Sequence, residues 1–147
     1  VRLATPITGA DKPLLTCGFA ARFAAWVSDK GAPAVKRATG APLQSLGTGP
    51  GYQCRGRNGD SSGKLSEHAF GNAVDIEYLK TADGETVNVN GGGFGLTSNA
   101  RLLKELRMDG CAYFTTVLGP GTNAAHAKHF HFDLEKRGRK GNHKLCE

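Results

Sequence analysis

Large apolar side chains recur at four-residue steps near the start of the chain and predict its first helix. Across residues 14–28 these positions are Leu15, Phe19, Phe23 and Val27. This spacing gives an amphipathic helix one apolar face that packs on a core. We expect the helix to end at Gly31 and Pro33. Residues 31–51 contain several Gly and Pro and are expected to form an irregular connection.

An alternation of apolar and polar residues over 72–79 predicts a strand. Its two faces carry Ala73, Asp75 and Glu77 on one side and Val74, Ile76 and Tyr78 on the other. Residues 85–89 are the expected hairpin partner, joined across a turn at 82–84. A further short strand is expected over 51–57, ahead of a turn at 58–60.

The second half of the chain predicts another helix and another strand. The helix is expected over 99–109, where three leucines share one face. Thr97 or Ser98 caps its start, and Gly110 marks its end. Residues 113–118 are β-branched and aromatic and predict a strand.

This order of elements indicates an α+β fold, with a mainly antiparallel central sheet flanked by helices. At 147 residues the chain has the size of one domain, and we assign residues 1–147 to it. No run of 18 apolar residues occurs, so no transmembrane segment is expected.

The net charge of +6 is concentrated in a basic C-terminal tail that begins at about residue 136. The basic residues of the tail are Lys136, Arg137, Arg139, Lys140 and Lys144. Such a tail is either a solvated segment or a surface for an anionic partner, such as a cell-wall polymer, an anionic lipid or nucleic acid. We expect no nucleic-acid partner, because no known binding motif and no interleaving of aromatic and basic residues is present.

The four cysteines are too far apart for a Cys-x-x-Cys motif. They are Cys17, Cys54, Cys111 and Cys146. This spacing favours two disulfides in an oxidising compartment over free thiols in a cytosolic protein. Of the three possible pairings we favour Cys17–Cys54 and Cys111–Cys146, because the second would hold the tail near the core. We therefore expect a periplasmic or secreted protein whose signal peptide is not in this chain.

Four of the five histidines gather in two short segments that also carry aspartates. The first segment contains His68 and Asp75, and the second contains His126, His129, His131 and Asp133. Imidazole nitrogens with one carboxylate and no thiolate are the ligand set of a hydrolytic zinc centre. If the two strands are neighbours, His68, Asp75 and His131 can converge on one zinc ion and leave a fourth position for water.

The other residues of the second segment are candidates for supporting roles. Alternation over 129–134 places His129, His131 and Asp133 on one strand face. Asp133 then either orients a ligand histidine or is an ordinary surface carboxylate. His126 and His129 are available as the base that accepts a proton from water and the group that stabilises the oxyanion.

With these residues the chain resembles the LAS superfamily of zinc peptidases, which includes D-Ala-D-Ala peptidases, murein endopeptidases and the hedgehog signalling domain. Their pattern is Ser-x-His-x-x-Gly-x-Ala-x-Asp followed by His-x-His, found here over 66–75 and 129–131. The chain is more closely similar to the bacterial extensin-like C-terminal domain family, through residues 52–55, 117–121 and 126–134.

The resemblance implies an LAS-type, hedgehog-like fold. It also implies one zinc ion per chain, held by His68, Asp75 and His131. Many members place a glutamate base three residues before His-x-His. This chain has His126 there, as the murein endopeptidases do, which makes His126 the implied base. Ser66 matches a position that contacts substrate in the dipeptidases.

The expected function is a zinc-dependent peptidoglycan peptidase that hydrolyses peptide cross-links of the bacterial cell wall. DD- and LD-endopeptidase action both fit the sequence, and so does carboxypeptidase action; the oligomeric state is not predicted. Arg55 is either an anchor for a substrate carboxylate or a surface arginine. The alternative is a catalytically silent, zinc-containing module that binds wall material or a protein, as the hedgehog relatives suggest.

Overall fold

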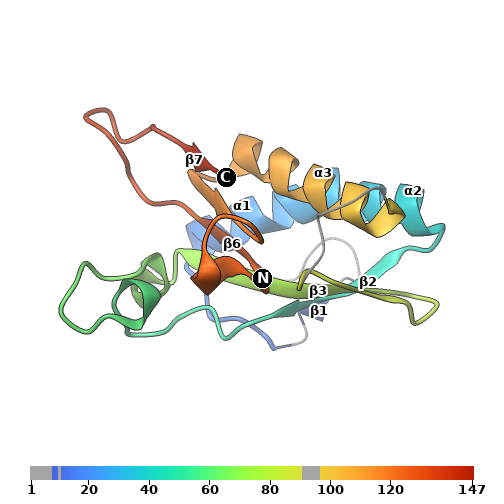
Figure 1. Cartoon of the computed structure of the whole chain (residues 1–147), viewed down its shortest axis with the longest axis horizontal. Helices are drawn as coiled ribbons and strands as arrows, with labels where there is room; N and C mark the ends of the chain where they lie inside the picture. Colours follow the sequence, from blue (N-terminus) through green and yellow to red (C-terminus); the bar gives the residue numbers. More distant parts are fainter. Residues whose placement is uncertain (1–7, 10, 91–96) are drawn as a thin grey trace.

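The computed structural model describes residues 8–9, 11–90 and 97–147, which form helices packed on a single sheet (Figure 1). The helices are α1 (Cys17–Trp26), the π-helical turn η1 (Val27–Gly31), α2 (Ala32–Thr39) and α3 (Ser98–Tyr113). The strands are β1 (Thr8–Gly9), β2 (Leu43–Thr48), β3 (Ala73–Thr81), β4 (Thr86–Asn88), β5 (Thr116–Leu118), β6 (Phe130–Asp133) and β7 (Leu145–Cys146). Short 3-10 turns are η2 (Arg57–Gly59), η3 (Glu67–Phe70) and η4 (Ala124–His126). The α+β class is confirmed.

The long strand β3 organises the sheet. Within the described ranges the sheet has seven strands, ordered β1-β2-β3-β6-β5-β7, with β4 also paired to β3. One edge of β3 pairs with β2, and the other edge is shared by β6 along 73–76 and β4 along 78–80. The pairs β1–β2 and β5–β7 are parallel and the others are antiparallel, so the prediction of a mainly antiparallel sheet is confirmed.

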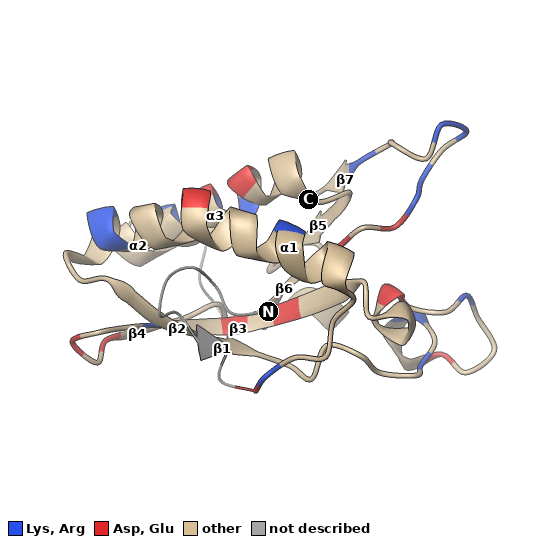
Figure 2. Cartoon of the chain, turned by 180° about the vertical axis from the view of Figure 1, so that it is seen from behind, with Lys and Arg blue, Asp and Glu red and all other residues tan. Residues whose placement is uncertain are grey.

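The helices cover one face of the sheet and enclose the core with it (Figures 1 and 2). The ring centroids of Trp26 and Phe132 are 5.0 Å apart, and those of Phe114 and Phe132 are 4.9 Å apart. Burying each such side chain contributes about 1.5–3 kcal/mol. Because side chains alternate along a strand, β3 and β6 turn Asp75 and His131 to the face away from the helices. No helix of the described segments has the length and apolar character needed to cross a membrane.

The predicted end of the first helix at Gly31 and Pro33 is wrong. The chain continues through η1 into α2, where Pro33 lies in the first turn. A proline is tolerated there because its missing N–H would have no partner within the helix. The helix ends instead at Gly40, whose φ of 82° is left-handed.

The region around residues 41–60 also differs from the prediction. Residues 43–48 form β2, so the expected irregular connection contains a strand as well as α2. The strand expected over 51–57 does not form. Gly51 and Gly56 make only isolated bridges, to Leu14 and Leu65.

Gly110 lies inside α3 and does not end it. A Cβ atom at this position would come within 3.2 Å of the Phe132 ring and 3.3 Å of Val117. Glycine therefore lets α3 approach the sheet closely. The predicted N-cap is confirmed at Thr97, whose hydroxyl accepts a hydrogen bond from the N–H of Ala100 at 3.1 Å.

The alternation of β3 changes at a β-bulge. Gly47 and Thr48 of β2 pair with Tyr78 and Ile76, which leaves Glu77 as an extra residue between them. An inserted residue exchanges the two faces of the strand beyond it. Leu79 is therefore buried, although the alternation placed Tyr78 on the apolar face. Tyr78 is half-buried.

One of the two predicted disulfides is present. Cys111 at the end of α3 is bonded to Cys146 in β7, which ties the end of the basic tail to the sheet. The predicted Cys17–Cys54 bond is not formed. Both of these cysteines are free, and both are exposed to solvent.

Candidate metal centre

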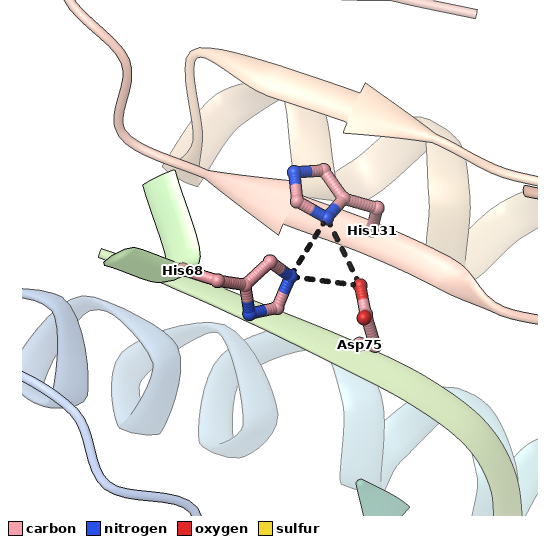
Figure 3. A group of neighbouring side chains, drawn as sticks. All are labelled: His68, Asp75 and His131. Atoms are coloured by element: carbon pink, nitrogen blue, oxygen red, sulfur yellow. Dashed lines mark hydrogen bonds and ion pairs between the residues drawn. The ribbon is translucent and has the colours of Figure 1, made fainter. Parts of the chain in front are cut away.

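Three separate elements bring His68, Asp75 and His131 together (Figure 3). His68 lies in η3, whose N-cap Ser66 accepts a hydrogen bond from the His68 N–H. The left-handed Gly71, with φ of 65°, then turns the chain into β3 and Asp75. His131 lies on β6 directly opposite Asp75 in the antiparallel register. The strands are thus neighbours, which is the condition under which the sequence predicted convergence.

The potential ligand atoms are close enough for one small cation. Asp75 Oδ1 lies 2.9 Å from His131 Nδ1 and 3.3 Å from His68 Nε2. The two imidazole nitrogens lie 3.3 Å apart. All three ligand atoms fall within 4.8 Å of one another. Two nitrogens and one carboxylate oxygen match the donor set of a catalytic zinc site, which keeps a fourth position open.

The second nitrogen of each histidine has its own acceptor. His68 Nδ1 lies 2.6 Å from the carbonyl oxygen of Gly51, and His131 Nε2 lies 3.0 Å from Asp133 Oδ2. With a proton on each of these nitrogens, His68 Nε2 and His131 Nδ1 keep their lone pairs toward the centre. Such outer partners fix the tautomer of metal-binding histidines. The residues therefore fit a zinc ion.

The charges around the centre shift the pKa values of its groups in opposite directions. Burial alone would raise the pKa of Asp75, but hydrogen bonds from His131 and His68 outweigh it and lower that pKa far below its ordinary value. Burial alone would lower the pKa of His131, but Asp133 and Asp75 outweigh it and raise that pKa to about 9. The same contact with His131 lowers the pKa of Asp133 against the effect of burial.

Comparison with known protein families agrees with the family resemblance that the motifs suggested. The family described as "Extensin-like protein C-terminus" matches residues 1–147. The chain belongs to this family. No curated protein and no solved structure matches the chain. The match covers the whole given chain and so includes every residue of the candidate centre.

The centre opens into a cleft of about 470 Å³ on the extensin-like domain. The cleft wall includes His126 and His129, whose rings lie 5.4 Å apart between centroids. His126 Nδ1 lies 2.8 Å from Asn123 Oδ1, so a proton on Nδ1 leaves the lone pair on Nε2. His129 Nε2 lies 3.5 Å from Asp75 Oδ1.

Both histidines of the cleft wall are shifted toward the neutral form. Burial, followed by the charges of His131 and His129, lowers the pKa of His126 to about 4. Burial also lowers the pKa of His129, although the charge of Asp75 opposes it. At neutral pH both rings are therefore in the neutral form, with one nitrogen lone pair free.

The two candidate substrate residues, Ser66 and Arg55, also line the cleft. Ser66 is buried, and its hydroxyl caps η3. Arg55 is half-buried, and its Nε donates a hydrogen bond to Gln53 Oε1 at 2.9 Å. All predicted site residues except His68 line this cleft. His68 is buried behind it and contacts Asp75 and His131.

Sequence reasoning missed several groups that shape this site. Gly51 supplies a backbone carbonyl, which leaves no side-chain signal. Asn123 does have a local signal, because it stands three residues before His126 and caps η4. Glu135 binds Arg57, which lies 78 positions away in the sequence, so no local pattern could reveal that pair.

Proposed function

We propose that this extensin-like domain is a zinc-dependent peptidase that hydrolyses peptide cross-links of bacterial peptidoglycan, as a DD- or LD-endopeptidase. The observation that carries the proposal is the convergence of His68, Asp75 and His131 at a cleft that also contains two further histidines. The Ser-x-His-x-x-Gly-x-Ala-x-Asp and His-x-His pattern adds support through its likeness to LAS-type zinc peptidases.

His68 Nε2, His131 Nδ1 and a carboxylate oxygen of Asp75 would hold the zinc ion. When bound there, zinc would lower the pKa of a water molecule to about 7 and polarise a carbonyl group. The protein fixes the two imidazole rings through Gly51 and Asp133. One zinc ion per chain is expected.

His126 is the proposed general base. Its Nδ1 is held by Asn123, and its neutral Nε2 can take a proton from the attacking water at neutral pH. The protonated ring could then return that proton to the leaving amine. Such a positioned base contributes about 10²–10⁴-fold to the rate.

His129 is the proposed stabiliser of the oxyanion. It lies directly before β6, two residues from His131, and its Nε2 lies 3.5 Å from Asp75 Oδ1. An N–H donor placed where negative charge develops lowers the barrier more than it lowers the energy of the bound substrate. Ser66 and Arg55 are proposed contacts to the peptide on the same cleft wall.

The proposed setting is the periplasm or the exterior of the cell. The Cys111–Cys146 disulfide is consistent with an oxidising compartment. The partners would be the peptide stems and cross-links of the wall.

Zinc-loaded protein incubated with purified muropeptides, analysed by liquid chromatography and mass spectrometry, tests this proposal. We expect cross-linked dimers to become monomers, and the product mass identifies the bond. His126→Ala should keep one zinc ion per chain and lose at least about 100-fold in rate. The control His143→Ala, at an exposed position in the loop before β7, should retain both properties.

Unchanged dimers with one zinc ion bound per chain would contradict the peptidase. Retained binding to the wall under those conditions would instead favour the silent binding module. Full turnover by His126→Ala would remove only the assigned base.

A further inference from the structure

A buried carboxylate gathers three cations at the end of the cleft next to the metal centre. The side chain of Glu135 is only 5% exposed. Its Oε1 accepts hydrogen bonds from Lys64 Nζ at 2.6 Å and from Arg57, and its Oε2 pairs with Arg137. Arg137 also donates hydrogen bonds to Thr116 Oγ1, from Nη2 at 3.1 Å and from Nε at 3.3 Å. The cation cluster, defined as Arg57, Lys64 and Arg137, is thus held at fixed positions.

The cation cluster joins two loops that extend from the same end of the molecule. Arg57 and Lys64 lie in the loop between β2 and η3, and Arg137 lies in the loop between β6 and β7 (Figures 1 and 2). Arg57, Arg137 and Glu135 line the same cleft as His131.

A short chain of hydrogen bonds connects the cation cluster to the metal centre. The Glu135 N–H donates to Asp133 Oδ1 at 2.9 Å, and Asp133 Oδ2 holds His131 Nε2. Thr116, which holds Arg137, pairs directly with Asp133 across β5 and β6. A group bound by Arg137 would therefore lie beside a substrate bond placed at the centre.

The charges of this end of the cleft do not cancel. Arg55, Arg57 and Arg137 line the cleft and Lys64 pairs with Glu135 beside it, which gives four positive charges, whereas Glu67 and Glu135 supply two carboxylates. Asp75 and Asp133 belong to the centre, where two positive charges of a zinc ion would balance them. An excess of two positive charges remains, which favours an anionic ligand.

The two guanidinium groups also keep unused donors. A guanidinium has five N–H donors in a planar fork. Among the described residues, Nη1 of Arg137 and Nη1 and Nε of Arg57 have no hydrogen-bond partner within the protein. The free Nη1 group of each guanidinium can donate a charge-assisted hydrogen bond to a carboxylate oxygen. Glu135 fixes the guanidinium groups in advance, so less side-chain entropy is lost when a ligand binds.

We propose that Arg137 and Arg57, positioned by Glu135, bind a free carboxylate of the substrate peptide next to the hydrolysed bond. This inference rests on the proposed peptidase function and deepens it, because it makes the substrate an acidic peptide. Arg137 and Arg57 are specificity residues, since they select the charge of the substrate without touching the reacting atoms.

Matched peptides that differ only in charge test the proposal. The probes are a cross-linked stem-peptide dimer with free carboxylates and the same dimer with those carboxylates converted to carboxamides. For zinc-loaded Arg137→Gln, we expect KM to rise at least about tenfold for the acidic dimer, as for the loss of one charge-assisted hydrogen bond. The KM for the amidated dimer and both kcat values should stay within about twofold.

Two further variants separate charge selection from folding. Arg137→Lys keeps the charge but loses the planar guanidinium and its free Nη1 group, so its KM for the acidic dimer should be intermediate. Arg139→Gln, at an exposed position in the same loop, should behave like the unchanged protein. Each variant must also bind one zinc ion. An equal rise in KM for both dimers, or no rise for either, would overturn the proposal.

A binding measurement keeps this proposal separate from the peptidase function. Calorimetric titration of the zinc-loaded protein uses the stem tripeptide L-Ala-γ-D-Glu-meso-diaminopimelate and its amidated form. Tighter binding of the acidic tripeptide by at least about tenfold, lost in Arg137→Gln, would support the carboxylate site even if no dimer is cleaved. Equal affinity for the two tripeptides would refute it even if dimers are cleaved.

Discussion

At the scale of single residues, the candidate centre depends on which nitrogen of each histidine carries a proton. Gly51 and Asp133 accept from the outer nitrogens of His68 and His131. The inner nitrogens then face Asp75, which is the arrangement that a metal ion requires. Asp133 has the larger electrostatic effect of the two acceptors, because it carries a charge and Gly51 does not.

Asp133→Asn is therefore expected to weaken zinc binding without abolishing it. The amide keeps the shape of the side chain but loses the charge that orients His131 and increases its basicity. The expected loss of affinity is about 10–100-fold, as for other outer partners of metal ligands. Competition with a chelator measures the zinc Kd, and circular dichroism checks the fold. An unchanged Kd would show that Asp133 is an ordinary carboxylate.

Zinc binding should also depend on pH through His131. Without a metal ion the pKa of His131 is raised to about 9, so at pH 7 the ring holds a proton that zinc must displace. A raised pKa means that the competing proton is lost as pH increases. Affinity should therefore rise about tenfold per pH unit between pH 7 and 9 and then level off.

Chelator competition across this pH range gives the profile, and calorimetry in two buffers of different ionisation enthalpy gives the number of protons released. In Asp133→Asn the pKa of His131 should be lower, so the plateau should begin at a lower pH. Affinity that does not change between pH 7 and 9 would contradict the proton displacement.

At the scale of elements, the Cys111–Cys146 disulfide holds β7 against the sheet. It closes a loop of 35 residues that includes β5, β6 and the loop between β6 and β7. The double variant Cys111→Ser with Cys146→Ser should lose about 3–4 kcal/mol of unfolding free energy, from the entropy of the longer free chain. Guanidinium chloride unfolding measures this loss.

The chain offers a matched control for the disulfide. Cys17 and Cys54 are both free and exposed. Their double substitution by serine should change the unfolding free energy by no more than about 0.5 kcal/mol, as for other surface positions. Equal losses in the two double variants would show that the Cys111–Cys146 bond has no special stabilising role.

Period-two patterns made β3 and β6 predictable, together with the faces that carry Asp75 and His131. The predictions that were wrong have physical causes that such patterns do not encode. Pro33 predicts a helix end, but the first turn of α2 tolerates a proline. Gly110 predicts the end of the second helix, but it lies inside α3 and allows close packing on Phe132. The contact of Glu135 with Arg57 depends on two distant loops, which no local pattern encodes.

At the scale of the whole molecule, one zinc ion would join three segments that are far apart in the chain. Binding only to the folded state stabilises it, by about 2.7 kcal/mol when free zinc is 100 times its Kd. For a domain of this size that corresponds to a rise in Tm of about 5–10 °C. Differential scanning calorimetry with and without zinc measures the rise.

His131→Ala removes one ligand and should remove this stabilisation, whereas His143→Ala should keep it. An equal rise in Tm for all three proteins would mean that zinc acts elsewhere on the molecule.

The central claim is that His68, Asp75 and His131 hold one zinc ion. A crystal structure of the zinc-loaded protein, with anomalous data collected on both sides of the zinc edge, tests it most directly. We predict one strong peak at about 2.0–2.2 Å from His68 Nε2, His131 Nδ1 and a carboxylate oxygen of Asp75. The absence of a peak there, or a peak bound by other residues, would contradict the account.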